Sequence, residues 1–126
     1  MYTLRVDGAF EAAHRVADYP GKCSRVHGHN WVVEATFTGQ ELDELGILID
    51  FKTAKQALAA VLEDFDHYYL NEFPPFSEGV NPTAENLARI IFERLAAHAE
   101  VRASAAQLSA LTVWESPKSS VTYTRD

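Results

Sequence analysis

The stretch from Tyr2 to His14, YTLRVDGAFEAAH, alternates between apolar and polar residues and decides the fold class of the chain. One parity carries Leu4, Val6, Phe10, Ala12 and His14, and the other carries Thr3, Arg5, Asp7 and Glu11. Successive side chains of a β-strand point to opposite faces, so this pattern predicts a strand with one face against a core. Gly8 lies in the middle of the pattern and indicates either a β-bulge or a close approach to the backbone.

A second alternating stretch follows at residues 29–38, HNWVVEATFT, with Trp31, Val33, Ala35 and Phe37 on one face. Between the two stretches, residues 15–28 lose the alternation and contain the turn-forming pair Pro20-Gly21. We therefore expect the two strands to pair antiparallel through a long loop.

Two helices and two further strands are expected after residue 39. Beyond Asp50, a candidate N-cap, apolar residues recur at helical spacing at Phe51, Ala54, Leu58, Val61, Leu62 and Phe65. A second helix is expected to start near Thr83, and its core face would carry Leu87, Ile90, Ile91, Arg94/Leu95 and His98. The tail predicts strands at 108–115 and 120–124, joined by a turn at Pro117-Lys118.

The resulting element order, ββααββ, predicts an α+β fold: a four-stranded antiparallel sheet with two helices on one face. A length of 126 residues without repeats or linkers predicts a single domain over residues 1–126. Such a sheet leaves its other face and both edges uncovered. We therefore expect the chain to associate with copies of itself into a larger sheet or barrel.

The composition limits the compartment and the classes of partner. A formal net charge of −7 argues against nonspecific binding to nucleic acid or to an anionic membrane surface. The first residues show no signal-peptide pattern, and no apolar run approaches the ~20 residues that span a bilayer. The single cysteine, Cys23, cannot form an intrachain disulfide. We expect a cytoplasmic protein with no nucleic-acid or membrane partner.

Three histidines form the strongest candidate for a metal site. His27 and His29 are two residues apart, so in an extended segment both imidazoles point to the same side. His14 ends the neighbouring strand and is the natural third ligand. Three histidines with an open coordination position are typical of catalytic zinc rather than of a closed structural site. Loop histidines without a metal are the alternative.

Three further positions carry groups suited to chemistry. Cys23 is either a fourth zinc ligand or a reactive thiolate that transfers protons, and a buried apolar cysteine is the plainer alternative. Adjacent Asp66 and His67 suit a relay in which the carboxylate orients the imidazole, or else a helix-terminal cap beside a surface histidine. Glu115, at a predicted strand end, is either an ordinary exposed glutamate or a partner for the N–C–N donor array of a heterocycle.

Together these residues resemble the 6-pyruvoyl-tetrahydropterin synthase family over nearly the whole chain. The resemblance consists of FEAAHR at 10–15, CSRVHGHN at 23–30, GILIDF at 46–51, FDHYYLN at 65–71, NPTAENL at 81–87 and VWE at 113–115. Three residues separate Cys23 from His27, as in bacterial members that make 6-carboxy-tetrahydropterin for queuosine-type deazapurine biosynthesis. Members that make 6-pyruvoyl-tetrahydropterin usually have a longer insertion there.

The resemblance implies a tunnelling fold whose sheets close into barrels only in an oligomer, typically a hexamer built from two trimers. It implies that zinc is bound by His14, His27 and His29, and that protons are transferred by Cys23, Asp66 and His67. It also implies that Glu115 anchors the pterin ring and that Thr83 and Glu85 line the pterin pocket. The implied reaction converts 7,8-dihydroneopterin triphosphate to 6-carboxy-5,6,7,8-tetrahydropterin and releases triphosphate and acetaldehyde. The alternatives are a 6-pyruvoyl-tetrahydropterin synthase, a non-catalytic zinc- or pterin-binding protein, and a structural zinc module with four protein ligands.

Overall fold

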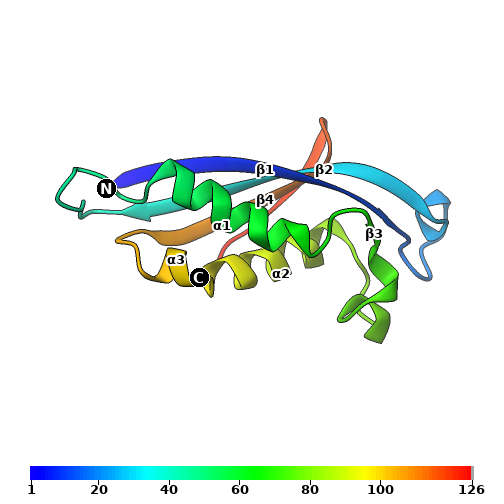
Figure 1. Ribbon diagram of the computed structural model, residues 1–126. Helices are drawn as coiled ribbons and strands as arrows, with labels where there is room; N and C mark the ends of the chain where they lie inside the picture. The colour runs from blue at the N-terminus through cyan, green and yellow to red at the C-terminus, as the bar shows by residue number, and fades with distance from the viewer. Residues whose placement is uncertain (126) are drawn as a thin grey trace.

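A single five-stranded sheet, with strand order β3-β1-β2-β4-β5, forms the centre of the computed structural model (Figure 1). The strands are β1 (Tyr2–His14), β2 (His27–Gly39), β3 (Tyr68–Tyr69), β4 (Gln107–Ser116) and β5 (Ser119–Tyr123). The structure describes residues 1–125, so Asp126, the last residue of the predicted domain, lies outside the described part.

The long hairpin of β1 and β2 confirms the antiparallel pairing expected from the two alternating stretches. Its register is continuous from the Tyr2–Gly39 pair to the His14–His27 pair, without a bulge. Gly8 therefore marks a close approach and not a β-bulge. A Cβ atom at this position would lie 2.9 Å from Cδ1 of Leu62 and 3.1 Å from Cδ2 of Leu58, so a helix packs directly onto the strand.

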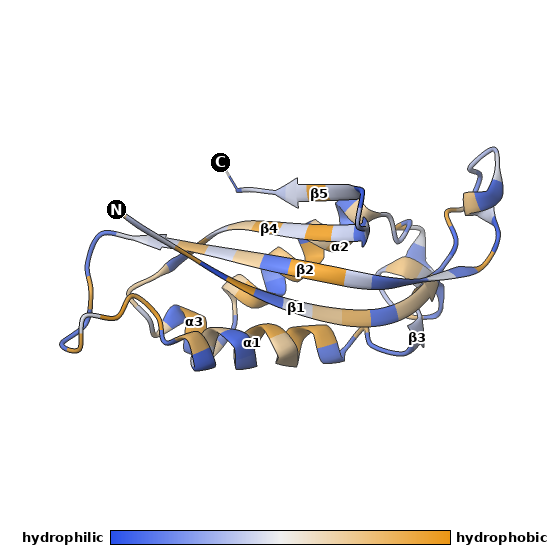
Figure 2. Ribbon diagram, turned by 90° about the horizontal axis from the view of Figure 1, so that it is seen from above, coloured by the Kyte–Doolittle hydropathy of each residue, from blue (hydrophilic) through white to orange (hydrophobic). Residues whose placement is uncertain are grey.

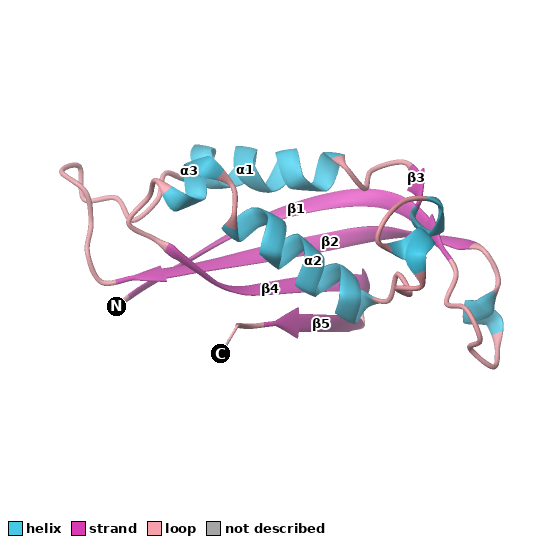
Figure 3. Cartoon of the chain, turned by 90° about the horizontal axis from the view of Figure 1, so that it is seen from below, coloured by secondary structure: helices cyan, strands magenta, loops and turns pink. Residues whose placement is uncertain are grey.

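Three helices accompany the sheet: α1 (Phe51–Glu63), α2 (Ala84–Ala96) and α3 (Ala99–Arg102). The carboxylate of Asp50 accepts a hydrogen bond from the N–H of Lys52 at 2.8 Å, which confirms the expected N-cap of α1. The Thr83 hydroxyl caps α2 in the same way, accepting from the N–H of Asn86 at 3.1 Å. Both longer helices lie along one face of the sheet (Figure 3), and their apolar residues form the core with the facing strand residues.

Phe51 begins α1 at the predicted position and is 60% exposed, beside a surface hollow shared with Tyr2 and Leu42. The expectation that His98 lies on the core face of the second helix was wrong. His98 lies beyond the end of α2 and caps α3 instead, where its Nδ1 accepts from the N–H of Glu100 at 3.2 Å. A four-residue helix such as α3 is too short to produce a recognisable apolar period.

The predicted four-stranded antiparallel sheet was also wrong, because β3 adds a fifth strand that runs parallel to β1. Its only two pairs join Ala12 to Tyr68 and Ala13 to Tyr69. A strand of two residues is too short to show an alternating pattern in the sequence. The pairing of β3 also depends on contacts between distant parts of the chain. The sheet is therefore mixed.

The face of the sheet opposite α1 and α2 carries no helix in the described part of the chain (Figure 2). Its side chains are largely polar and interact across strands. The indole N–H of Trp114 donates to the Glu34 carboxylate at 2.8 Å, and this carboxylate also lies 3.6 Å from the Arg5 guanidinium. This confirms the expectation of an uncovered sheet face. No helix among residues 1–125 has the length and apolar character needed to cross a membrane.

Candidate functional site

The register of the central hairpin brings three histidines together at one end of the sheet. His14 pairs with His27, and Ala12 pairs with His29, so all three imidazoles lie on the face that carries the helices. One ring nitrogen from each histidine lies within 4.8 Å of the others. The ring centroids are 4.5 Å apart for His14 and His27, 5.0 Å for His14 and His29, and 4.8 Å for His27 and His29.

Backbone carbonyls orient two of these rings. Nδ1 of His14 lies 2.7 Å from the carbonyl oxygen of Pro82, and Nδ1 of His27 lies 2.7 Å from that of Arg25. A carbonyl oxygen only accepts hydrogen bonds, which assigns the proton to Nδ1 in both rings. The Nε2 atoms of both rings therefore keep their lone pairs, the arrangement found when a histidine ligand is held by an outer partner.

The cluster has the properties that a bound cation would satisfy. Nε2 of His14 and Nε2 of His29 are buried without a hydrogen-bond partner among the described atoms, which is costly for a polar atom. Burial lowers the pKa of both histidines, so they favour the neutral form that binds metals. Three imidazole nitrogens without a fourth protein donor suit a zinc ion with an open position.

Trp31 supports the cluster from the core side. It is fully buried, and its ring centroid lies 5.0 Å from that of His14 and 5.1 Å from that of His29. Its indole N–H donates to the carbonyl of Ala12 at 3.3 Å. The alternation of residues 29–38 predicts Trp31 as a core residue and does not by itself identify its contact with the histidines. Trp31 lies two residues after His29 and four after His27 in the same strand, so the three side chains point to the same face. This spacing in the sequence could have identified Trp31 as a neighbour of the site.

Glu115 lies next to the histidines. Its Oε1 is 3.4 Å from Nε2 of His29, because β4 lies beside β2, although the two atoms form no hydrogen bond. The nearby cavity, of about 620 Å³, is lined by carboxylates and by apolar surface from Val32, Trp114 and Pro117. A hollow of this size with a carboxylate and an aromatic wall can hold a small planar heterocycle.

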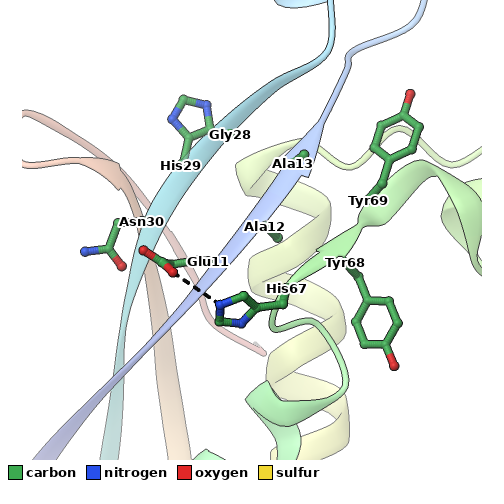
Figure 4. Close-up of a pocket in the computed structure, with 9 residues that line it drawn as sticks. All are labelled: Glu11, Ala12, Ala13, Gly28, His29, Asn30, His67, Tyr68 and Tyr69. Carbon is green, nitrogen blue, oxygen red and sulfur yellow. Dashed lines mark ion pairs between the residues drawn. The ribbon is translucent and has the colours of Figure 1, made fainter.

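Asp66 and His67 form the pair expected for a relay. Nδ1 of His67 lies 2.9 Å from Oδ2 of Asp66, and Nε2 lies 3.5 Å from a carboxylate oxygen of Glu11 (Figure 4). The hydrogen bond and charge of Asp66 raise the pKa of His67. The N–H of Glu11 and the bond to His67 lower the pKa of Asp66.

The backbone fixes this pair against β1. The N–H of His67 donates to the carbonyl of Glu11 at 2.6 Å, and the N–H of Glu11 donates to Oδ1 of Asp66 at 2.9 Å. His67 adopts a φ of 63°, in the left-handed region that is costly for a residue with a Cβ. The docking on β1 therefore fixes where the imidazole lies.

Within one chain, His29 and His67 both line a cavity of about 570 Å³, but the His67 imidazole lies beside the Glu11 carboxylate and is not part of the group of histidine nitrogens around His14. Glu11 pairs with Asn30 and faces the uncovered side of the sheet, opposite to His14. The rings of His67 and His29 accordingly do not point toward each other (Figure 4).

Cys23 lies in a short 3-10 turn, Lys22–Ser24, within the loop between β1 and β2. It is half-buried and is not part of the group of nitrogens around His14. This favours a free thiol over a fourth metal ligand.

Thr83 and Glu85 lie at the start of α2, next to the Pro82 carbonyl that holds His14. The Thr83 hydroxyl is engaged as the helix cap, and Glu85 is exposed in the first turn. Neither lines the cavity beside Glu115. Their local positions are explained by the helix start alone.

Comparison with known proteins agrees with this geometry. The family model described as 6-pyruvoyl tetrahydropterin synthase matches residues 3–126. A 6-carboxy-5,6,7,8-tetrahydropterin synthase of Bacillus subtilis is 32% identical over 126 residues, covering 97% of this chain and 84% of the relative. A putative 6-pyruvoyl tetrahydrobiopterin synthase of Caenorhabditis elegans is 32% identical over 131 residues, covering 94% and 91%. The solved structure of Caenorhabditis elegans 6-pyruvoyl tetrahydropterin synthase matches with a TM-score of 0.82 at 28% identity, over 99% of this chain and 96% of that one. The chain therefore belongs to the 6-pyruvoyl tetrahydropterin synthase family.

Proposed function

We propose that this chain is a zinc-dependent carbon–carbon lyase that acts on 7,8-dihydroneopterin triphosphate. One water would be consumed, and the products would be 6-carboxy-5,6,7,8-tetrahydropterin, triphosphate and acetaldehyde, in queuosine-type deazapurine biosynthesis. The observation that carries the proposal is the cluster of three histidines beside Glu115, two of which have a buried Nε2 atom without a partner, in a chain of this family.

We assign His14, His27 and His29 as the zinc ligands. The carbonyls of Pro82 and Arg25 hold Nδ1 of His14 and His27, so Nε2 of both rings is available to a metal on the face of the sheet that carries the helices. Zinc bound there would supply a Lewis acid that acidifies the O–H and adjacent C–H bonds of the substrate side chain. Glu115 would accept hydrogen bonds from the pterin ring. The proposal that Thr83 and Glu85 line the pterin pocket rests on the family resemblance alone, since neither lines the cavity beside Glu115 within one chain.

The proton transfers are assigned to Cys23, Asp66 and His67. The Cys23 thiolate would remove a proton from the substrate side chain, and His67, oriented by Asp66, would exchange protons on the other side. The His67 imidazole lies beside Glu11, which faces the uncovered side of the sheet, whereas the three imidazoles of the cluster face the helices. We infer that the dyad reaches the substrate from a neighbouring copy. We also propose, as the family resemblance implies, a hexamer of two trimers in which the sheets close into barrels. We propose further that the whole chain is one domain and that the protein is cytoplasmic.

The competing reaction within the family is triphosphate elimination alone, which gives 6-pyruvoyl-tetrahydropterin. The three-residue spacing between Cys23 and His27 favours the carboxy-forming reaction. Overall identity does not separate the two, because the bacterial and nematode relatives are both 32% identical to this chain. Only the carboxy-forming reaction releases acetaldehyde, so the products distinguish them.

The test is incubation of the zinc-loaded protein with 7,8-dihydroneopterin triphosphate, followed by mass analysis of the pterin and an assay for acetaldehyde. We expect the carboxy product and acetaldehyde. Cys23→Ala should keep zinc and lose turnover, whereas His27→Ala should lose both, with His98→Ala as the control. A pyruvoyl product without acetaldehyde would assign the alternative reaction. Bound zinc and pterin without turnover would indicate the non-catalytic protein.

A further inference from the structure

Two asparagine side chains fasten the segment that follows β1. The Asn71 amide accepts from the N–H of Arg15 at 2.9 Å and donates to the carbonyl of the same residue at 3.0 Å. The Asn81 amide accepts from the N–H of Ala17 at 3.1 Å and donates to its carbonyl at 3.4 Å. Each amide thus satisfies both backbone groups of one residue, as a neighbouring strand would.

Residues 15–17, which the two asparagines fasten, hydrogen-bond to the 3-10 turn that carries Cys23. The N–H of Val16, which lies between the two fastened residues, donates to the Cys23 carbonyl at 2.7 Å. Nε of Arg15 donates to the Ser24 carbonyl at 2.9 Å. Residues 15–17 therefore connect the two asparagines on one side with the cysteine turn on the other.

These contacts anchor a loop that has little other support. Apart from the contact of the Arg25 carbonyl with His27, the other hydrogen bonds of residues 16–25 in the described structure run within the loop itself. The Ser24 N–H and hydroxyl both bond to the Gly21 carbonyl, for example, and so fix the turn internally. Those bonds shape the turn but do not fix its position relative to the rest of the chain.

We propose that Asn71 and Asn81 are positioning residues for Cys23. The inference rests on the proposed function, in which the Cys23 thiolate transfers a proton. Proton transfer requires the thiolate within about 3 Å of its target, and a displacement of about 1 Å can reduce the rate on the order of 100-fold. Neither asparagine side chain hydrogen-bonds to a histidine of the cluster, so the effect should fall on turnover and not on zinc binding.

The variants that test this are Asn71→Ala, Asn81→Ala and the conservative Asn71→Asp, which keeps the acceptor for the Arg15 N–H but loses the donor. The matched control is Ser104→Ala. Its hydroxyl also bonds to backbone groups, donating to the Val101 carbonyl at 2.7 Å and accepting from the Ala106 N–H at 3.2 Å, far along the chain from the site. Each protein is measured for zinc content, melting temperature, kcat and KM. The rate of Cys23 alkylation by iodoacetamide is measured between pH 6 and 10, and a single cysteine makes this readout unambiguous.

We expect both alanine variants to keep zinc, to lower kcat about 10- to 100-fold with KM changed less than threefold, and to alter the alkylation rate at least threefold. Asn71→Asp should give an intermediate kcat. Ser104→Ala should lower the melting temperature to a similar extent without changing kcat or alkylation. If Asn71→Ala or Asn81→Ala has the same kcat and the same alkylation rate as Ser104→Ala, the proposal is overturned for that asparagine. Loss of zinc in either variant overturns it as well.

The alkylation readout separates this inference from the proposed function. If the wild-type protein does not turn over the pterin triphosphate, the proposed function fails. The alkylation profiles then still decide whether the two asparagines hold Cys23.

Discussion

Replacing His14 by phenylalanine tests the assignment of the metal site through stability alone. His14 is 1% exposed, and its two ring nitrogens have different surroundings. Nδ1 donates to the Pro82 carbonyl at 2.7 Å, whereas Nε2 is buried without a partner. Phenylalanine keeps the aromatic packing against Trp31 but removes both nitrogens.

Two opposing changes set the free energy of unfolding of the metal-free variant. The loss of a partner for the Pro82 carbonyl lowers the free energy of unfolding of the variant by about 1–3 kcal/mol. Removal of the unpartnered Nε2 raises the free energy of unfolding by a similar amount. The metal-free His14→Phe protein should therefore lie within about 2 kcal/mol of the metal-free wild type. Zinc at 1,000 times its dissociation constant should stabilise the wild type by about 4 kcal/mol. With one of three ligands removed, the variant should gain less than about 1 kcal/mol at the same free zinc concentration.

The assay is urea unfolding of wild type and variant, each after chelation and at a buffered free zinc concentration. His98→Ala is the matched control, because His98 caps α3 and lies outside the histidine cluster. It should keep the full zinc response. The assignment of the site is refuted if His14→Phe and the wild type gain equal stability from zinc, or if the wild type gains none.

Three further outcomes follow from the geometry. Gly8→Ala should lower the free energy of unfolding by about 1–3 kcal/mol in urea titrations, because the added Cβ would lie 2.9 Å from Cδ1 of Leu62; an unchanged midpoint would contradict that packing. Thr83→Ala should cost about 1 kcal/mol through the lost N-cap while zinc content stays at the wild-type level, and metal loss would instead link Thr83 to the site. The Asp66–His67 pair should stabilise the protein over a limited pH window, measured as the difference in stability between wild type and His67→Asn. Since the pKa of Asp66 is lowered from 3.8, its contribution is present above pH 3.8 and is lost as pH falls through the folded pKa. Since the pKa of His67 is raised from 6.5, its contribution is present below pH 6.5 and is lost as pH rises through the folded pKa. A difference that is constant from pH 3 to 9 would contradict the pairing.

The sequence predicted the long elements of the fold well, because their periods repeat many times. The alternation of residues 2–14 and 29–38 identified β1 and β2, and the candidate N-cap Asp50 and the expected start near Thr83 agree with the observed starts of α1 and α2. The two-residue β3 and the four-residue α3 were missed, since neither is long enough to show a period. The parallel pairing of β3 depends on the docking of His67 onto β1, a contact between residues 56 positions apart along the chain.

For the candidate site, the sequence by itself determined which residues share a face. The parity of His27 and His29, and the position of His14 at the end of the paired strand, follow from the two-residue repeat of a β-strand. The same repeat places Trp31 beneath them.

Tertiary structure decided what each of these side chains can do. The Pro82 carbonyl that holds His14 lies 68 positions away along the chain, and Glu115 reaches His29 only because β4 packs beside β2. Tertiary structure also placed the His67 imidazole beside Glu11, whose side chain faces away from the three imidazoles. A local pattern specifies the direction of a side chain relative to its own backbone. Hydrogen-bond partners, burial and the resulting pKa shifts depend on which distant segment packs against it, and only the folded chain determines that.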